Sequence, residues 1–167
     1  MKLLLTLDEK DYTEDMPVFE KYTVRAIICN GDKFIMQRSR AGEYKIPGGG
    51  VEEGESYIET IIREVREEVG LIVKPESITE IGGILEIRED RMCKGQKYVC
   101  HSLFYRCEVE EETVPTEMTF SEIEKGFEPV WERLEKIVER NDEIQKENWM
   151  KRDTEFLRLL LENKIEL

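Results

Sequence analysis

The stretch from residue 47 to residue 71 constrains this chain more than any other part of its sequence. It reads PGGGVEEGESYIETIIREVREEVGL, with one proline and three consecutive glycines at its start and seven glutamates in total. The three- and four-residue spacing of its apolar residues predicts an amphipathic helix over residues 56–69. The residues expected on the core-facing side are Ile58, Ile61, Ile62, Val65 and Val69. Gly70 is expected to end the helix in a left-handed cap, before Leu71 starts an extended run.

Three glutamates are expected to gather beside this apolar side of the helix. Glu64, Glu67 and Glu68 fall on an arc of about 100° in a helix with about 3.6 residues per turn. Like charges at this spacing repel by roughly 0.2–0.5 kcal/mol per pair. A divalent cation with a preference for oxygen ligands, Mg²⁺ or Mn²⁺, would relieve that repulsion. The helix alone leaves two interpretations open, a metal site and a solvated acidic surface.

The spacing within the whole stretch resembles the Nudix box, G-x5-E-x7-R-E-U-x-E-E-x-G-U, in which U is a bulky aliphatic residue. All nine specified positions are present over 23 residues: Gly49, Glu55, Arg63, Glu64, Val65, Glu67, Glu68, Gly70 and Leu71. The chain is therefore identified as similar to MutT-like Nudix hydrolases. The resemblance covers roughly residues 20–145, so the first twenty residues and the last helix are expected to be subfamily additions.

The resemblance implies roles for residues of the box. The expected metal ligands are the carbonyl of Gly48 and the carboxylates of Glu64, Glu67 and Glu68. Glu55 and Arg63 are expected to orient these ligands. Glu67, Glu64 and Arg63 are the expected catalytic residues, with Glu67 as the candidate general base. The implied cofactor is Mg²⁺ or Mn²⁺.

The implied activity is metal-dependent hydrolysis of a diphosphate bond in a nucleoside diphosphate that is linked to another moiety. The alternative is a regulator with the Nudix fold that binds nucleotides without turnover. Such a sensor is free to lose the box glutamates, whereas this chain keeps all of them, which favours the enzyme. The substrate remains open among oxidised nucleoside triphosphates, ADP-ribose or nucleotide sugars, dinucleoside polyphosphates and the 5′ end of RNA.

Several residues outside the box are candidates for contacts with the substrate. The basic candidates are Arg25, Arg38 and Arg40, which precede the glycine loop. Glu86 is expected on a strand that borders the same cleft, and an additional acid is open among Glu122, Glu124 and Glu128. A solvated position at a strand end explains each arginine at least as well, and an exposed surface position explains each of the three acids after the second strand pair better. The lone histidine, His101, is interpreted as structural or cleft-lining, which is favoured over a catalytic role. Tyr44 and Phe104 could stack on a base, but core positions are favoured for both.

The remaining sequence predicts an α/β protein of the α+β kind, with a mixed β-sheet sandwiched between helices. Strand-like runs occupy residues 2–7, 23–29, 33–39, 78–89 and 97–110. Asn30-Gly31 predicts a hairpin. Residues 111–126 are expected to form a polar connection, followed by a short extended piece over 127–131 and a helix over 132–141. Asp153 or Thr154 is expected to open a last helix, which places Phe156, Leu157, Leu160 and Leu161 in the core.

Length and charge limit the organisation and the partners of the chain. At 167 residues it is expected to form a single domain, residues 1–167. A net charge of −13 argues against DNA and anionic membranes as partners and disfavours RNA. Its four cysteines form no C-x-x-C pair, which favours reduced thiols and a cytoplasmic location. A homodimer remains open.

Overall fold

A computed structural model of the chain describes residues 2–144 and 148–167. The helices are α1 (Tyr57–Val69), α2 (Phe120–Lys125), α3 (Leu134–Ile144) and α4 (Asn148–Leu161), with a single 3₁₀ turn, η1 (Pro75–Ser77). The strands are β1 (Leu3–Asp8), β2 (Val18–Ile27), β3 (Cys29–Asn30), β4 (Lys33–Arg38), β5 (Tyr44–Lys45), β6 (Leu71–Val73), β7 (Thr79–Glu89), β8 (Lys97–Arg106), β9 (Val109–Thr113) and β10 (Glu128–Arg133). Within the described residues no helix is long and apolar enough to cross a membrane.

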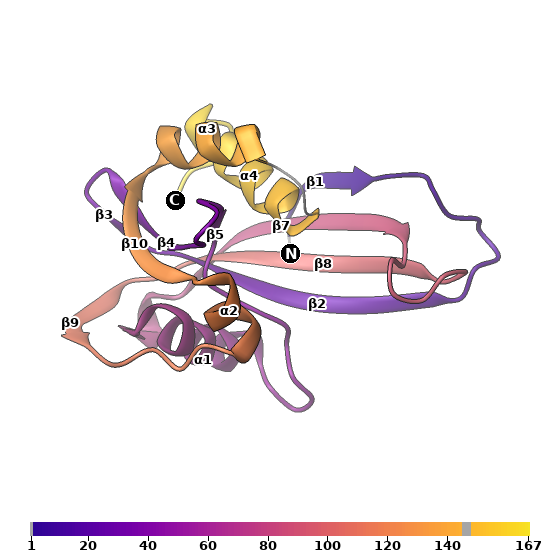
Figure 1. The fold of residues 1–167 in the computed structure, drawn as a ribbon. Coiled ribbons are helices and arrows are strands. Elements are labelled where there is room, and N and C mark those ends of the chain that lie inside the picture. Colours follow the sequence, from indigo (N-terminus) through magenta and orange to yellow (C-terminus); the bar gives the residue numbers. More distant parts are fainter. Residues whose placement is uncertain (1, 145–147) are drawn as a thin grey trace.

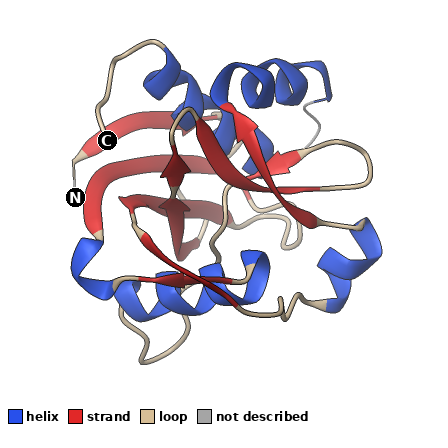
Figure 2. Ribbon diagram, turned by 90° about the vertical axis from the view of Figure 1, so that its left-hand side faces the viewer, coloured by secondary structure: helices blue, strands red, loops and turns tan. Residues whose placement is uncertain are grey.

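The strands form a mixed sheet that lies between helices. The larger sheet has the order β1-β7-β8-β2, in which the β1-β7 and β2-β8 pairs are parallel and the β7-β8 pair is antiparallel. A smaller sheet joins β10, β4 and β3, with β5 on β4, and β6 pairs with β9. Helices α3 and α4 lie on one side of the strands, and α1 and α2 lie on the other (Figures 1 and 2). The predicted α+β architecture is confirmed.

Two apolar cores fill the two sides of the larger sheet, because successive residues of a strand point to opposite faces. On β2, Val24 and Ala26 join the core under α1, whereas Ile27 joins the core under α3 and α4. On β8, Leu103 packs toward α1 and Phe104 packs toward α4. Strands β2 and β8 thus connect the layer that carries the glutamates to the layer that carries the last helix.

Helix α1 follows the predicted pattern with one exception. Ile61, Val65 and Val69 are buried against the sheet, and Ile62 packs against the same core. The expectation that Ile58 faces the core is wrong, since its side chain is 46% exposed in the first turn. The predicted cap at the other end is confirmed, because Gly70 has a φ of 66° and its N–H donates to the Arg66 carbonyl.

The start of α1 is fixed by a capping box. The Ser56 hydroxyl accepts a hydrogen bond from the Glu59 N–H, and the Glu59 carboxylate accepts one from the Ser56 N–H. We expect Ser56→Ala to lower the free energy of unfolding by about 1 kcal/mol, because the first turn loses this acceptor. Urea unfolding would measure the loss, with Ser121→Ala on the exposed surface of α2 as the control. Equal unfolding midpoints for the two variants would contradict the capping role.

The segments after β8 differ from the prediction. The expected strand over 97–110 ends at Arg106, and β9 turns away to pair with β6. The expected polar connection over 111–126 contains α2, whose own capping box joins Thr119 and Glu122. Threonine followed three residues later by glutamate is the sequence signature of such a box, so this signal was present in the chain.

The last helix begins earlier than predicted. Helix α4 starts at Asn148, so Asp153 and Thr154 lie inside it and cannot open it. Both side chains are fully buried and make tertiary contacts: Asp153 accepts a hydrogen bond from the Ile46 N–H, and Thr154 accepts one from the Asn141 amide. The expected core residues Phe156, Leu157 and Leu160 are buried, and Leu161 packs against them.

The predicted hairpin is confirmed, with its turn one residue later than the Asn-Gly pair indicates. Asn30 pairs with Lys33, so Gly31 and Asp32 form the turn. Gly31 alone in this turn has a positive φ, 62°.

Candidate active site

Arg63 gathers the carboxylates of the box on one side of α1. Its Nε and Nη2 donate to the two carboxylate oxygens of Glu55, over 2.7 and 2.9 Å. Its Nη1 donates to Glu64 over 2.8 Å and to Glu67 over 3.4 Å. The hydrogen bond from Arg63 lowers the pKa of Glu55 to about 2, and the same hydrogen bond raises the pKa of Arg63. One guanidinium therefore holds three carboxylates in a fixed arrangement.

The glycine loop lies against both β2 and the carboxylates of α1. Gly48 has a φ of 137°, and a Cβ there would lie 2.1 Å from the Val24 carbonyl oxygen. A Cβ on Gly49 would lie 2.1 Å from the Glu64 carboxylate. The Val24 N–H donates to the Gly49 carbonyl over 3.0 Å, which ties the loop to β2. Gly48 therefore requires glycine, because its backbone approaches β2 closely at a positive φ, whereas a side chain at Gly49 would push the Glu64 carboxylate away.

We expect Gly49→Ala to displace the Glu64 carboxylate and to lower kcat/KM by about 10–100-fold, the range observed when residues that orient metal ligands are lost. Gly50→Ala is the matched control, because its Cβ would meet only the end of the Lys21 side chain, at an ordinary 3.5 Å. Steady-state kinetics and urea unfolding of both variants would separate the two effects. Equal activity of the two variants would contradict the proposed contact between Gly49 and Glu64.

Glu68 is the buried member of the glutamate cluster. Its side chain is 4% exposed, and Oε2 accepts a hydrogen bond from the Gly48 N–H over 2.7 Å. Burial raises the pKa of Glu68 to about 8, although the contacting Lys45 ammonium acts in the opposite direction. Lys45 also donates to Glu122 over 2.9 Å. Burial opposes ionisation of Glu122 as well, but its hydrogen bond with Glu68 and the charge of Lys45 lower its pKa to about 2.

The chemistry of this donor set fits a hard cation. The carboxylates of Glu64 and Glu68 lie against the backbone of Gly49 and Gly48, and oxygen ligands are those that Mg²⁺ and Mn²⁺ prefer. Glu64 and Glu67 are occupied by Arg63, and Glu68 is occupied by Lys45. In this arrangement, no group of three or more His, Cys, Asp or Glu side chains among the described residues is placed to hold a metal ion.

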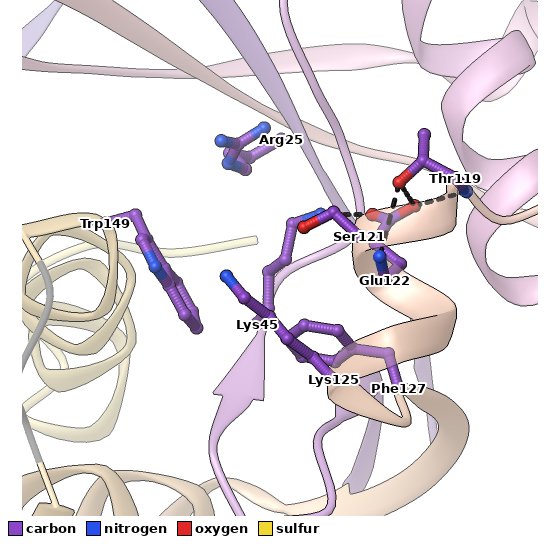
Figure 3. A pocket seen from close by; sticks show the side chains of 8 residues that line it. All are labelled: Arg25, Lys45, Thr119, Ser121, Glu122, Lys125, Phe127 and Trp149. Atoms are coloured by element: carbon purple, nitrogen blue, oxygen red, sulfur yellow. Dashed lines mark hydrogen bonds and ion pairs between the residues drawn. The ribbon is translucent and has the colours of Figure 1, made fainter. Parts of the chain in front are cut away.

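A pocket of about 320 Å³ opens beside Lys45, between α2 and α4. Figure 3 shows the Trp149 indole on the side of α4, facing Lys45, Lys125 and Phe127 across the pocket. The Phe127 and Trp149 ring centroids are 6.5 Å apart in an edge-to-face arrangement. The complete lining comprises Arg25, Lys45, Thr119, Ser121, Glu122, Lys125, Phe127 and Trp149. Lys45 joins this pocket to the buried Glu68.

The sequence matches the NUDIX domain family over residues 20–158. The chain belongs to this family. The match includes most of α4, so this NUDIX domain extends further along the chain than the region over which the resemblance was recognised from the sequence.

Two curated relatives resemble the chain over part of its sequence. A protein of Pseudoalteromonas translucida named RNA pyrophosphohydrolase is 32% identical over 102 residues, which cover 53% of this chain and 58% of the relative. One of the same name from Shewanella piezotolerans is 46% identical over 57 residues, 33% of this chain and 32% of the relative. The chain thus spans less than two thirds of either relative.

Two solved structures resemble the fold of this NUDIX domain. A NUDIX hydrolase from Nitrosomonas europaea has a TM-score of 0.58 at 20% identity, covering 83% of this chain and 88% of the other. A MutT NUDIX hydrolase from Burkholderia pseudomallei has a TM-score of 0.52 at 18% identity, covering 70% of this chain and 85% of the other. At these identities the likeness concerns the fold.

The NUDIX domain brings two of the candidate substrate residues into the pocket, Arg25 and Glu122. Arg38 and Arg40 are exposed and line other surface pockets. Glu86 is buried on β7, where it accepts a hydrogen bond from Arg88 over 2.7 Å. Of the three acids considered after β8, Glu122 lines the pocket beside Lys45, whereas Glu124 and Glu128 do not.

Tyr44 and Phe104 are buried, and His101 packs against a neighbouring strand. Tyr44 and Phe104 are 3% and 0% exposed. The His101 ring stacks on Tyr22, with centroids 4.6 Å apart, and its Nε2 lies 3.1 Å from the Glu20 carboxylate.

Three residues of the site were missed in the sequence, namely Lys45, Phe127 and Trp149. Lys45 stands two residues before the Pro-Gly-Gly-Gly loop, on the strand that leads into the loop. One face of that strand is turned toward the helix, so the position of Lys45 in the sequence was the available signal for a contact with the glutamates. Trp149 was missed because the last helix was expected to begin only at Asp153.

Proposed function

We propose that this chain is a single-domain pyrophosphohydrolase that uses Mg²⁺ or Mn²⁺ to cleave a diphosphate bond in a nucleoside diphosphate linked to another moiety. The observation that carries the proposal is the contact between the glycine loop and α1. There, a Cβ on Gly49 would collide with the Glu64 carboxylate, and Arg63 holds Glu64 and Glu67 beside the loop. Membership of the NUDIX family supports the same conclusion.

The residues that would hold the cation are Glu64, Glu67 and Glu68, together with the Gly48 carbonyl. A bound divalent cation supplies charge neutralisation at the phosphate oxygens and lowers the pKa of water. Arg63 and Lys45 now occupy these carboxylates, so both cationic side chains would have to yield part of their contacts. Glu55 would keep Arg63 in place, because it accepts two of its hydrogen bonds.

Glu67 is the residue we assign as general base. Its side chain is 36% exposed and contacts Arg63 only at 3.4 Å, so it is the most accessible carboxylate of the three. In the hydrolysis, the water oxygen forms a bond to phosphorus, one proton of the water passes to Glu67, and the bond from phosphorus to the bridging oxygen breaks. The bridging oxygen leaves with the departing phosphate group.

The 5′ end of RNA is a second candidate substrate, because the curated relatives are named RNA pyrophosphohydrolases. The expectation that RNA is disfavoured rests on the net charge of −13 and conflicts with those names. A local excess of positive charge answers that objection, since three cationic side chains and one carboxylate line the pocket. The four cysteines are free, which agrees with a cytoplasmic location of the protein, whichever substrate it uses.

A substrate panel tests the proposal. Oxidised and ordinary nucleoside triphosphates, ADP-ribose, a nucleotide sugar, a dinucleoside tetraphosphate and a 5′-triphosphorylated RNA would be incubated with the protein, with and without Mg²⁺ or Mn²⁺. We expect release of phosphate or pyrophosphate, or of two nucleotides, only when the metal is present. Binding of a nucleotide without hydrolysis of any substrate would favour the sensor instead.

A further inference from the structure

The pocket between α2 and α4 contains a buried guanidinium whose charge is incompletely balanced. Arg25 is 6% exposed, and its Nε is buried without a hydrogen bond to any described residue. The Arg25 Nη1 donates to the Val24 carbonyl over 2.8 Å. The Asp153 carboxylate lies 3.7 Å from the Arg25 Nε and is already bound by Arg152 over 2.7 and 2.8 Å. Burial, and after it the neighbouring charge of Arg152, lowers the pKa of Arg25, against the opposing charges of Asp153 and Glu68. A buried cation with so little compensation is a position where an anionic group of a ligand binds favourably.

The wall of the same pocket carries a second cation and an aromatic surface. Among the described residues, no carboxylate pairs with the exposed Lys125 ammonium, which faces Trp149 across the pocket (Figure 3). Lys45 contributes a further positive charge, although Glu68 and Glu122 already contact it. Cationic groups next to an aromatic side chain are the combination that binds a nucleotide through its phosphate and the face of its base.

Two residues that line the pocket also line a neighbouring cavity. Lys125 and Trp149 also line a cavity of about 500 Å³, together with Arg40, Glu43 and Glu124. Its charges are balanced, so the excess of positive charge is confined to the inner pocket near Arg25. Each of the two cavities has a volume within the range of about 300–1,000 Å³ that is found for small-ligand sites.

We propose that this pocket binds a second nucleotide, joined through phosphate to the nucleotide whose diphosphate is hydrolysed, with its phosphate on Arg25 and Lys125 and its base on Trp149. The inference rests on the proposed function in one respect, namely that the diphosphate bond is hydrolysed at the glutamates of α1. A neutral sugar in this place would supply no anion to the buried Arg25 or to Lys125, which pairs with no carboxylate of residues 2–144 and 148–167. Dinucleoside polyphosphates and the 5′ ends of RNA both supply the required phosphate-linked second nucleotide.

A binding experiment tests the second-nucleotide site without turnover. Trp131 and Trp149 are the two tryptophans of the chain, so Trp131→Phe leaves Trp149 as the sole fluorescent reporter. A nucleoside triphosphate, a nucleotide sugar, a dinucleoside tetraphosphate and a 5′-triphosphorylated dinucleotide would be titrated in Ca²⁺, which is intended to support binding without rapid hydrolysis. We expect quenching of Trp149 by the last two ligands only. Equal quenching by the nucleoside triphosphate, or quenching by none of the four, overturns the proposal.

Steady-state kinetics on the same ligands provide a second, independent test of the second-nucleotide site. We expect Lys125→Ala and Trp149→Ala each to lower kcat/KM about tenfold for substrates with a second nucleotide, and less than about twofold for a nucleoside triphosphate. Lys94→Ala, on an exposed loop, and Phe19→Ala, at the far end of β2, are the matched controls. Equal losses on all substrates would assign the pocket to the hydrolysed nucleotide and overturn the inference.

The two arms separate this inference from the proposed function. Quenching of Trp149 without hydrolysis of any ligand would refute the enzyme and keep the second-nucleotide site. Hydrolysis that is indifferent to Lys125 and Trp149 would keep the enzyme and refute the site. A 5′-triphosphorylated trinucleotide distinguishes the two sources of ligand, because only an RNA site gains affinity from the third nucleotide.

Discussion

Glu67→Gln is expected to lower kcat by on the order of 10²–10⁴-fold, the contribution of a well-placed general base. Glutamine keeps the size of the side chain and an oxygen that can accept from Arg63, but it carries no charge and takes up no proton at neutral pH. The free energy of unfolding should hardly change, because the Glu67 side chain is 36% exposed and its contact with Arg63 is long, 3.4 Å. The loss should therefore appear in turnover and not in folding.

Steady-state kinetics at saturating Mg²⁺, on whichever substrate the panel identifies, would measure this loss. Glu53→Gln, an exposed glutamate of the loop before α1, is the control for removal of one negative charge. Glu68→Gln extends the test to a buried ligand position, and there the metal concentration for half-maximal activity should also rise. Unchanged turnover in both Glu67→Gln and Glu68→Gln would remove these glutamates from the mechanism.

The parts of the site that the sequence predicts well are those determined by local spacing. Arg63, Glu64, Glu67 and Glu68 share one helix, so helical geometry fixes their relative positions once the helix is recognised. Gly70 ends that helix because it adopts a φ of 66°, which glycine tolerates best. The two-sided core is also local in origin, since it follows from the alternation of residues along β2 and β8.

The parts that the sequence does not predict depend on contacts between distant segments. Lys45 belongs to the site because it reaches Glu68 and Glu122, which are 23 and 77 residues away along the chain. Trp149 and Phe127 meet across the pocket only because α4 packs beside the segment that follows α2. The start of α4 was mistaken for the same reason: Asp153 has the residue type of a helix cap, but its carboxylate is used in a tertiary contact.

Asp153→Ala is expected to lower the free energy of unfolding by about 3–5 kcal/mol, the loss typical when one partner of a buried ion pair is removed. The Asp153 side chain is 0% exposed, accepts two hydrogen bonds from Arg152 and lies 3.7 Å from Arg25. Alanine would leave two buried guanidiniums without a carboxylate between them. It would also leave the Ile46 N–H without its acceptor, which now lies 3.0 Å away.

Urea unfolding followed by circular dichroism would measure this loss, with two comparisons that separate its causes. Asp153→Asn keeps an oxygen for the Ile46 N–H and removes only the charge, so it should be less destabilising than Asp153→Ala. Asp142→Ala removes an exposed carboxylate that pairs with Arg158 over 2.7 Å, and its effect should stay within about 1 kcal/mol. Similar small losses in all three variants would show that Asp153 does not hold the buried cluster together. Because Ile46 directly precedes the Pro-Gly-Gly-Gly loop, a clearly smaller loss in Asp153→Asn than in Asp153→Ala would support a role for α4 in anchoring the segment that positions the loop against Glu64 and Glu68.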